Sequence, residues 1–231
     1  MKRFTSFLTA IILAGFFSVS MLHAQEAGTG MVSKTENPFS VGADVYSSYV
    51  WRGVKFSGPS FQPYLEASFG NFTIGSWGSF DFIGGFAEAD IYASYAFDFG
   101  LSLGVTDYYY PGTSYFEFSD SLGAHALEIN AGYEIGGLSI GANYIVNEAG
   151  GAASAGGDMY FELGYSFDNF SLFVGGGDGW HTSDGEFMIT NVGISSEKEI
   201  KVSETFSLPV SGAVILNPEM EQFFVVVGIS F

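Results

Sequence analysis

The chain has 231 residues, which is enough for one barrel or one sandwich, and its 18% of aromatic against 14% of charged residues is unusual for a soluble protein. Its formal net charge is −18 with 7 Lys and Arg in total, so nucleic acid is not an expected partner, because phosphate contacts need cations. The sequence holds no cysteine, which excludes disulfides and thiolate metal sites, and we predict no cofactor.

The N-terminus resembles a secretory signal peptide. Lys2 and Arg3 precede the uncharged stretch Phe4–Leu22, and Ala24 occupies a suitable cleavage point. A membrane anchor is the alternative, although the most apolar part of the stretch is shorter than a span. We predict three segments: a signal peptide over 1–24, a disordered periplasmic leader over 25–39, and a folded domain over 40–231.

From Ser40 onward apolar and polar residues alternate, which is the period of a β-strand. Short turns and longer segments alternate between the runs, and the charged connection 196–204 is an exception on the short-turn side. Short turns on one rim, long loops on the other and an even strand count predict a transmembrane antiparallel up-and-down β-barrel of about 12 strands, with both termini in the periplasm. The twelve runs are 41–53, 60–70, 72–82, 87–97, 100–110, 123–134, 138–147, 158–167, 170–177, 187–196, 205–216 and 222–231.

The apolar face of these runs carries aromatic side chains near both ends and aliphatic ones between them. Such girdles suit the headgroup depth of a bilayer, whereas a β-sandwich, the alternative fold, would bury its rings in the middle. The pattern favours the outer membrane of a Gram-negative bacterium. The short-turn end carries Phe69, Phe72, Phe97, Tyr133, Phe167, Phe170, Phe206 and Phe231, and the other end carries Tyr49, Trp51, Phe61, Phe80, Tyr109 and Phe223.

Two positions test the strand register. Pro209 lacks the N–H that a closed ladder needs, so we expect a bulge or a local break there. Asp107 falls on the lipid-facing side unless its run contains a bulge.

The last run ends on Phe231, with Ile229 and Val227 on the same face. A terminal aromatic residue after alternating apolar positions is similar to the signal that the outer-membrane assembly machinery reads. The expected partners are therefore that machinery, the lipid bilayer and lipopolysaccharide.

The opposite face of the runs should line the interior of the barrel. Seven carboxylates face one arginine there, so the interior either holds a structural hydrogen-bond network or favours cations. Twelve tilted strands give a backbone radius of roughly 12 Å, which side chains narrow to a bore for ions or small solutes. The predicted lining residues are Asp44, Arg52, Glu66, Trp77, Asp81, Glu88, Asp90, Glu128 and Glu162.

Signals for catalysis or metal binding are weak, and we predict that the protein is not an enzyme. His125 and His181 fall near the long-loop rim, and Ser183 beside His181 imitates part of an acyl-transfer site, although a solvated glycine-rich loop explains this arrangement better. Weak candidates for a Ca²⁺ site are Asp178, Asp184 and Glu186, whose spacing is not that of a recognised loop.

Residues 47–82 contain Tyr49-Val-Trp51-Arg52-Gly53, then Pro59, Gln62-Pro63 and Gly75-Ser-Trp77-Gly-Ser. This stretch resembles the opening of the porin family called TorF, with its Tyr-x-Trp-Arg-Gly followed by Pro and a Trp-Gly-Ser strand. Residues 108–112 and 127–129 are similar to that family's next segments, whereas 149–157 and 196–204 do not match it. The resemblance implies an outer-membrane channel and no particular substrate.

Together these patterns predict a monomeric outer-membrane pore for small solutes or ions, with a preference for cations. The alternatives are a non-conducting structural or surface barrel and, less strongly indicated, a lipid-modifying barrel enzyme. Conductance across a bilayer separates the first two, and dependence on His125 or His181 would indicate the third.

Overall fold

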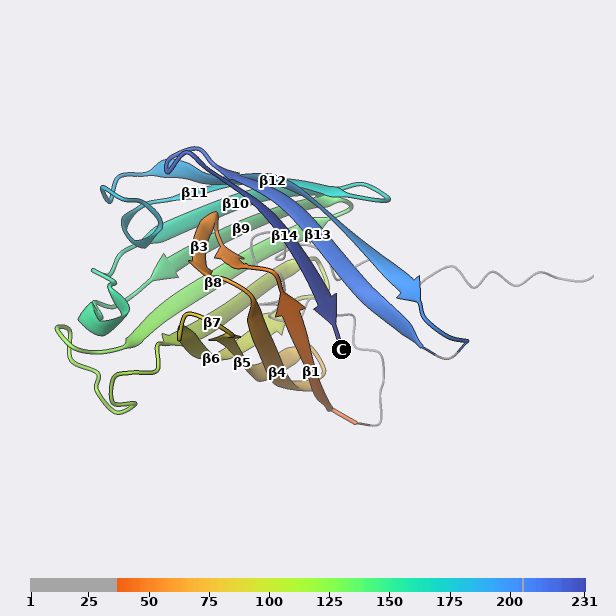
Figure 1. Cartoon of the computed structure of the whole chain (residues 1–231). Coiled ribbons are helices and arrows are strands. Elements are labelled where there is room, and N and C mark those ends of the chain that lie inside the picture. Colours follow the sequence, from red (N-terminus) through yellow and green to blue (C-terminus); the bar gives the residue numbers. More distant parts are fainter. Residues whose placement is uncertain (1–36, 205) are drawn as a thin grey trace, which may run out of the picture.

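The computed structural model describes residues 37–204 and 206–231, which form one closed barrel of twelve antiparallel strands (Figure 1). Each strand pairs with its neighbours along the chain, and β1 closes the ring against β14. The predicted closed up-and-down barrel is therefore confirmed. Its strands are β1 (Phe39–Tyr46), β4 (Ser60–Phe69), β5 (Phe72–Asp81), β6 (Ala87–Ala96), β7 (Leu101–Tyr109), β8 (His125–Ile135), β9 (Leu138–Ile145), β10 (Met159–Ser166), β11 (Ser171–Gly177), β12 (Met188–Lys201), β13 (Ser207–Asn217) and β14 (Gln222–Ser230).

The two rims of the barrel differ in their connections. Tight turns such as Gly70-Asn71 and Gly136-Gly137 lie on one rim, where Gly70 and Gly136 adopt φ of 64° and 62°. Long loops lie on the other rim and include two short 3₁₀ helices, η1 (Gly150–Ala152) and η2 (Gly179–His181). We call these the short-turn rim and the long-loop rim. Among the described residues, no helix is both long and apolar enough to cross a membrane.

The predicted signal peptide (1–24) lies outside the described residues, as does the predicted leader (25–39) up to residue 36. Phe39, the last residue of that leader, is already part of β1. At the other end of the chain, Phe231 and Ala43 exchange two backbone hydrogen bonds of 3.0 and 3.3 Å. The final residue therefore closes the seam between β14 and β1.

The first predicted run, 41–53, is wrong in its second half. β1 ends at Tyr46, and the chain then turns into the barrel as a separate two-stranded sheet, β2 (Tyr49–Trp51) with β3 (Val54–Ser57). We call residues 49–57 the inner hairpin, and Figure 1 shows it within the ring of strands. A run of this length exceeds the roughly 9–11 residues that a tilted strand needs to cross a bilayer, which leaves its end free to fold inward.

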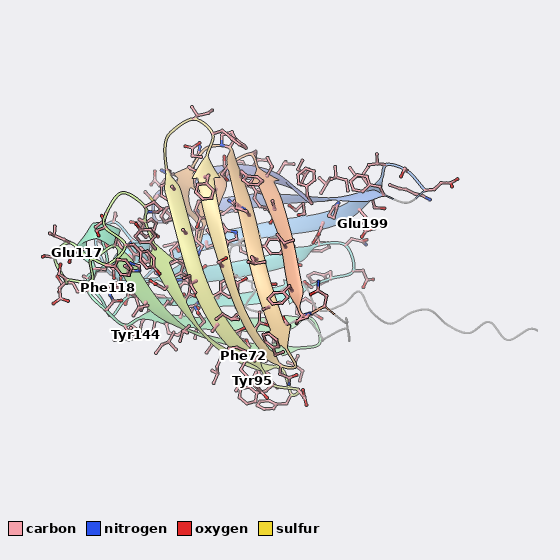
Figure 2. All side chains as sticks on the ribbon, turned by 90° about the horizontal axis from the view of Figure 1, so that it is seen from below. Phe72, Tyr95, Glu117, Phe118, Tyr144 and Glu199 are labelled. Carbon is pink, nitrogen blue, oxygen red and sulfur yellow. The ribbon has the colours of Figure 1, made fainter. Side chains whose placement is uncertain are left out.

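Consequently, Tyr49 and Trp51 do not belong to an outer aromatic girdle. Both side chains are buried inside the barrel. At the short-turn rim, Phe72 and Tyr95 pair across β5 and β6, and Figure 2 shows the two side chains together at that end of the wall.

The turn of the inner hairpin is Arg52-Gly53, with φ of 50° and 81°. A two-residue loop with both φ positive matches the right-handed twist of its strands. Gly53 adopts this conformation at little cost, and a Cβ at Gly53 would overlap the carbonyl oxygen of Thr190. Arg52 adopts it at a cost, because its Cβ crowds the backbone there.

Alternate residues of each strand point to opposite sides of the wall, as the period of two predicted. The paired parts of β7 contain no register shift, so Asp107 lies on the outer side. Polar residues buried on the inner side include Asp44, Gln62, Thr73, Ser94, Thr106, Asn130 and Asn143. Apolar residues exposed on the outer side include Leu65, Ile74, Ile91, Val105, Ile129, Ile140, Leu163 and Val225.

β12 and β13 continue past the neighbouring strands as a two-stranded ribbon on the short-turn side, where Figure 2 labels Glu199. Their pairing runs to Lys201↔Ser207, so the predicted connection 196–204 is largely strand. Pro209 lies in this ribbon. The pairing of β13 with β14 begins one residue later, at Val210. Proline is tolerated there because, among the described residues, β14 forms no pair with β13 at this position, so the missing N–H of Pro209 disrupts no ladder.

Of the bulge or local break predicted at Pro209, the bulge is wrong, whereas the pairing of β13 with β14 does stop at Val210, next to Pro209. The described β12–β13 pairs keep one register past this residue. A register shift occurs instead between Gly175 and Gly176, where β11 pairs with β12.

We predict that Gly53→Ala destabilises the folded barrel more than Gly85→Ala. Both glycines have positive φ, 81° and 77°, so each substitution carries a similar backbone cost of about 1–2 kcal/mol. Only at Gly53 would the new Cβ also meet backbone, whereas nothing lies within 4 Å at Gly85. The temperature at which folded protein loses its compact gel migration measures the difference. Equal losses for the two variants would contradict the docked position of the turn.

Candidate functional site

The candidate site is the long-loop half of the barrel interior, into which the inner hairpin carries Arg52. The guanidinium Nη1 donates to Glu128 Oε2 at 2.6 Å, and Nη2 donates to Glu128 Oε1 at 2.8 Å. Both side chains are inaccessible to solvent, at 1% and 0%. A bidentate pair of this kind is the strongest way to satisfy a buried guanidinium, and it fixes the hairpin tip against β8.

The surroundings of this pair satisfy its remaining hydrogen-bonding capacity. Glu128 Oε1 also accepts from the Tyr108 hydroxyl at 3.0 Å and from Asn130 Nδ2 at 2.6 Å. The Arg52 guanidinium lies 4.3 Å from the ring centroid of Trp51 and 4.5 Å from that of Tyr160. These contacts offset part of the cost of taking both charges out of water.

The backbone of the hairpin tip is anchored to the opposite wall. The Thr190 hydroxyl donates to the Arg52 carbonyl at 3.1 Å, and Asn217 Nδ2 donates to the Gly53 carbonyl at 3.1 Å. The tip is thus held by β8 on one side and by β12 and β13 on the other. It crosses the interior rather than lying along one wall.

His181, at the end of η2, is buried beside this pair. Its Nε2 lies 3.4 Å from Arg52 Nη1, and because arginine can only donate, Nε2 has to accept. Burial, and then the Arg52 cation, lower the pKa of His181 well below its ordinary value. His181 is therefore a neutral ring with its proton on Nδ1.

Aromatic rings fill the space around the hairpin. Tyr49 lies 5.5 Å from Trp77, and Trp51 lies 5.5 Å from Tyr108, measured between ring centroids. Trp180 of η2 packs against Trp51 at 5.6 Å. Large rings from the hairpin, the wall and a long loop therefore close this half of the interior.

Two carboxylates on β6 lie within the same half. Glu88 Oε1 accepts from the Tyr110 hydroxyl at 3.3 Å. Glu88 Oε2 and Asp90 Oδ1 are buried and have no hydrogen-bond partner among the described residues. Tyr49 of the inner hairpin lies within hydrogen-bonding reach of Glu88, so the hairpin approaches β6 as well as β8.

The short-turn half of the interior is more open. Glu66 accepts from the Tyr92 hydroxyl at 2.6 Å, and Glu162 accepts from the Tyr160 hydroxyl at 2.6 Å and from Asn191 at 3.0 Å. Both glutamates are partly exposed, unlike Glu128. These two carboxylates therefore keep partial contact with solvent.

The structure brings most of the predicted lining residues into the interior but gives them different surroundings. Arg52 comes from the inner hairpin rather than from the wall, and Asp44, Trp77, Glu88, Asp90 and Glu128 are buried. Asp81 does not join them: its two oxygens accept from the backbone N–H groups of Ile83 and Gly84, so it shapes a loop. Asp81 is the last residue of β5, so the N–H groups of the following loop lie within reach of its carboxylate.

Tyr110 and Trp180 contribute to the closed half and were not identified from the sequence. Trp180 lies in a long loop, where strand alternation gives no direction to a side chain. For Tyr110 a signal was available, because it ends the predicted run 100–110 and alternation with the outward Asp107 places it on the inner face.

The residues singled out for catalysis lie apart. His125 Nδ1 is 3.0 Å from both Asp107 oxygens on the outside of the wall, whereas His181 is inside. The Ser183 hydroxyl donates to Glu219 rather than to His181. The acyl-transfer arrangement suggested by the sequence is therefore absent among the described residues.

The candidate metal ligands have other partners. Asp178 Oδ1 accepts from the Met159 N–H at 2.6 Å, and Asp184 Oδ1 accepts from the Glu186 N–H at 3.0 Å. Within the described ranges, no three His, Asp or Glu side chains lie close enough together to hold a metal ion. Asp178 and Asp184 thus have structural contacts in their loop.

No protein-family model and no curated protein matches the sequence. Among solved structures, the barrel is similar to a triple mutant of Rhodopseudomonas blastica porin, with a TM-score of 0.39 and 16% identity over 74% of this chain and 55% of that one. Another variant of the same porin gives a TM-score of 0.42 and 15% identity over 85% of this chain and 74% of the other. This chain thus spans about half the length of the first of these porins. With scores this low, the function has to be inferred from the chain's own residues.

We predict that the inner hairpin undocks as the pH falls below about 6.5, the ordinary pKa of histidine. A histidine whose pKa is lowered on docking binds fewer protons when docked, so docking is strongest above 6.5 and weakens by up to about 1.4 kcal/mol per pH unit below it. Hydrogen exchange of the Tyr49–Ser57 amides, compared between variants at each pH, measures this. His181→Gln should remove the dependence in this window, and His125→Gln should keep it. An identical pH profile for wild type and His181→Gln would contradict the prediction.

Proposed function

We propose that this protein is an outer-membrane channel of the porin type, closed in this structure by its inner hairpin, which passes ions or small solutes when the hairpin moves. The observation that carries the proposal is the Arg52–Glu128 pair, which holds the hairpin across the interior. The apolar outer face of the barrel and the separate sheet of the inner hairpin also support the proposal.

The outer face supports a location in a membrane. Its exposed residues are predominantly apolar, and a soluble protein rarely exposes such a continuous apolar surface. β4, β5 and β6 have 10 residues each, which suits a tilted crossing of a bilayer. A closed ring of strands also satisfies the backbone hydrogen bonds that lipid cannot.

The arrangement of the hairpin supports reversible closure. The inner hairpin forms its own two-stranded sheet and shares no ladder with the described wall strands, so it can move without breaking the barrel. Its tip is held by a few polar contacts, and Arg52 carries backbone strain that undocking would release. A non-conducting structural barrel is the second candidate, and the complete burial of the Arg52–Glu128 pair is the observation that favours it.

We further propose that the long loops face outward from the cell and that both termini are periplasmic. Long external loops and short periplasmic turns are the usual arrangement in bacterial barrels. Phe231 then serves as part of the assembly signal, with the assembly machinery and lipopolysaccharide as partners. We also propose that the protein is related to the TorF-like porins, on the sequence resemblance described above.

We also propose that the open channel prefers cations. Glu66 and Glu162 are partly exposed in the short-turn half, and carboxylates in a narrow bore act over about 8–10 Å at ordinary salt. Arg52 is the one arginine of the described chain, and its charge is offset by Glu128.

We predict that Arg52→Gln increases conductance in planar bilayers. Removing one partner of a buried ion pair costs about 3–5 kcal/mol because the other charge is left unpaired, so the docked state loses most of its advantage. Lys55→Gln removes the same charge from an exposed position of the same hairpin and should leave conductance at the wild-type level. If Arg52→Gln is folded, loses hairpin protection and still does not conduct, the structural barrel takes the place of the channel.

We predict that Glu66→Gln with Glu162→Gln, introduced into the conducting Arg52→Gln background, shifts the reversal potential in a salt gradient toward zero. The control is Glu197→Gln with Glu199→Gln, which removes two charges from the exposed ribbon outside the bore and should leave the potential unchanged. Anion selectivity in the background variant would overturn the proposed cation preference.

A further inference from the structure

A hollow of about 550 Å³ lies on the outside of the wall, across β4 to β7. Figure 2 looks onto the part of the wall that contains β4, β5 and β6. The hollow falls within the range of roughly 300–1,000 Å³ that is usual for small-molecule sites. Neither the channel function nor the closure by the inner hairpin accounts for it.

The sequence of β4 and β5 explains why the wall is hollowed there. Proline has no N–H to donate, and the β4–β5 pairs stop after Phe61↔Phe80 and resume at Tyr64↔Trp77, with Pro63 in the gap. Three of the outward residues that line the hollow are small, namely Ser76, Gly78 and Ala89, although the ring of Phe80 lies against Gly78. A weak ladder and missing side-chain volume therefore coincide.

At this gap the hollow extends to residues of the inner face. Trp77 and Asp90 contribute to its lining although both point inward by strand alternation. Asp90 is 2% exposed, and its Oδ1 has no hydrogen-bond partner among the described residues. The hollow thus reaches a buried carboxylate.

The edge of the hollow on β7 carries one polar contact. Asp107 lines it and contacts His125, whose other ring nitrogen, Nε2, lies 2.7 Å from the Tyr115 carbonyl oxygen. Both nitrogens of His125 thus face oxygen atoms of the protein. Asp107 remains 24% exposed, so the pair presents a polar group to the hollow. Leu65 and Ile91 lie in the same cross-strand row as Asp107, so apolar side chains lie directly beside this polar contact.

We propose that this hollow binds one acyl chain of a membrane lipid, with the chain along Ser76, Gly78 and Ala89 and the head group at Asp107 and His125. The proposal rests on the proposed membrane location of the barrel. The hollow is continuous with the apolar outer face, where exposed Leu65, Phe80 and Ile91 border it, so hydrocarbon chains are what it meets in a bilayer. A bound chain keeps water out of the gap beside Asp90 and so seals the wall.

The test uses the folded full-length barrel in phosphatidylcholine vesicles that contain phosphatidylethanolamine with a photoreactive acyl chain. Cross-links in the wild type should concentrate on the peptides of β5 and β6 that border the hollow. Ala89→Phe fills the hollow and should lower this labelling by roughly tenfold, as excluding about two methylene groups would. Ala142→Phe adds the same ring to an outward position of β9 away from the hollow and should change nothing.

Ser76→Phe fills the same hollow from β5, so the result does not depend on the folding of one variant. Labelling spread evenly around the outer face, or equal labelling in the Ala89→Phe and Ala142→Phe proteins, overturns the lipid site while leaving the membrane location intact. No labelling on any strand would instead overturn the membrane location itself.

Discussion

The long-loop half of this barrel depends on one buried cation. A guanidinium taken out of water needs a carboxylate and further partners, and Arg52 finds them in Glu128 of β8 with Tyr108 and Asn130 behind it. That requirement fixes how far the inner hairpin enters and which wall its tip meets. The positive φ of Arg52 is tolerated because the contacts of its side chain stabilise this backbone conformation by more than the strain costs.

The carboxylates of the interior consequently fall into different physical roles. Glu128 is neutralised by Arg52, and Asp81 binds loop N–H groups, so neither is free to act on a solute. Glu66 and Glu162 bond to tyrosines but remain partly exposed. An interior that looks uniformly acidic in sequence is therefore divided into a sealed half and an accessible half.

The wall shows how a closed ladder tolerates proline in two ways. Pro209 lies in the projecting ribbon, where one side of β13 has no ladder among the described strands, and the register is undisturbed. Pro63 lies between two partners, and there the ladder to β5 is interrupted and the outer surface is hollowed. The same residue type is harmless at an edge and creates a recess within the sheet.

The sequence by itself determined the barrel. Alternation with a period of two assigns each strand residue to a face of the wall. The barrel strands from β4 to β14 followed from this local pattern, as did the outward position of Leu65 and Ile91 and the inward position of Asp90 and Glu128. Only the tertiary structure decided where the residues after β1 go, because alternation does not say whether a strand continues in the wall or turns into the interior. Tyr49, Trp51 and Arg52 continue the alternation of β1 perfectly well, and they turn inward because the partners of Arg52 lie far away in the chain, on β8, β12 and η2. Contacts between residues so distant in sequence leave no local period, which is why the closure of the interior had to be seen in three dimensions.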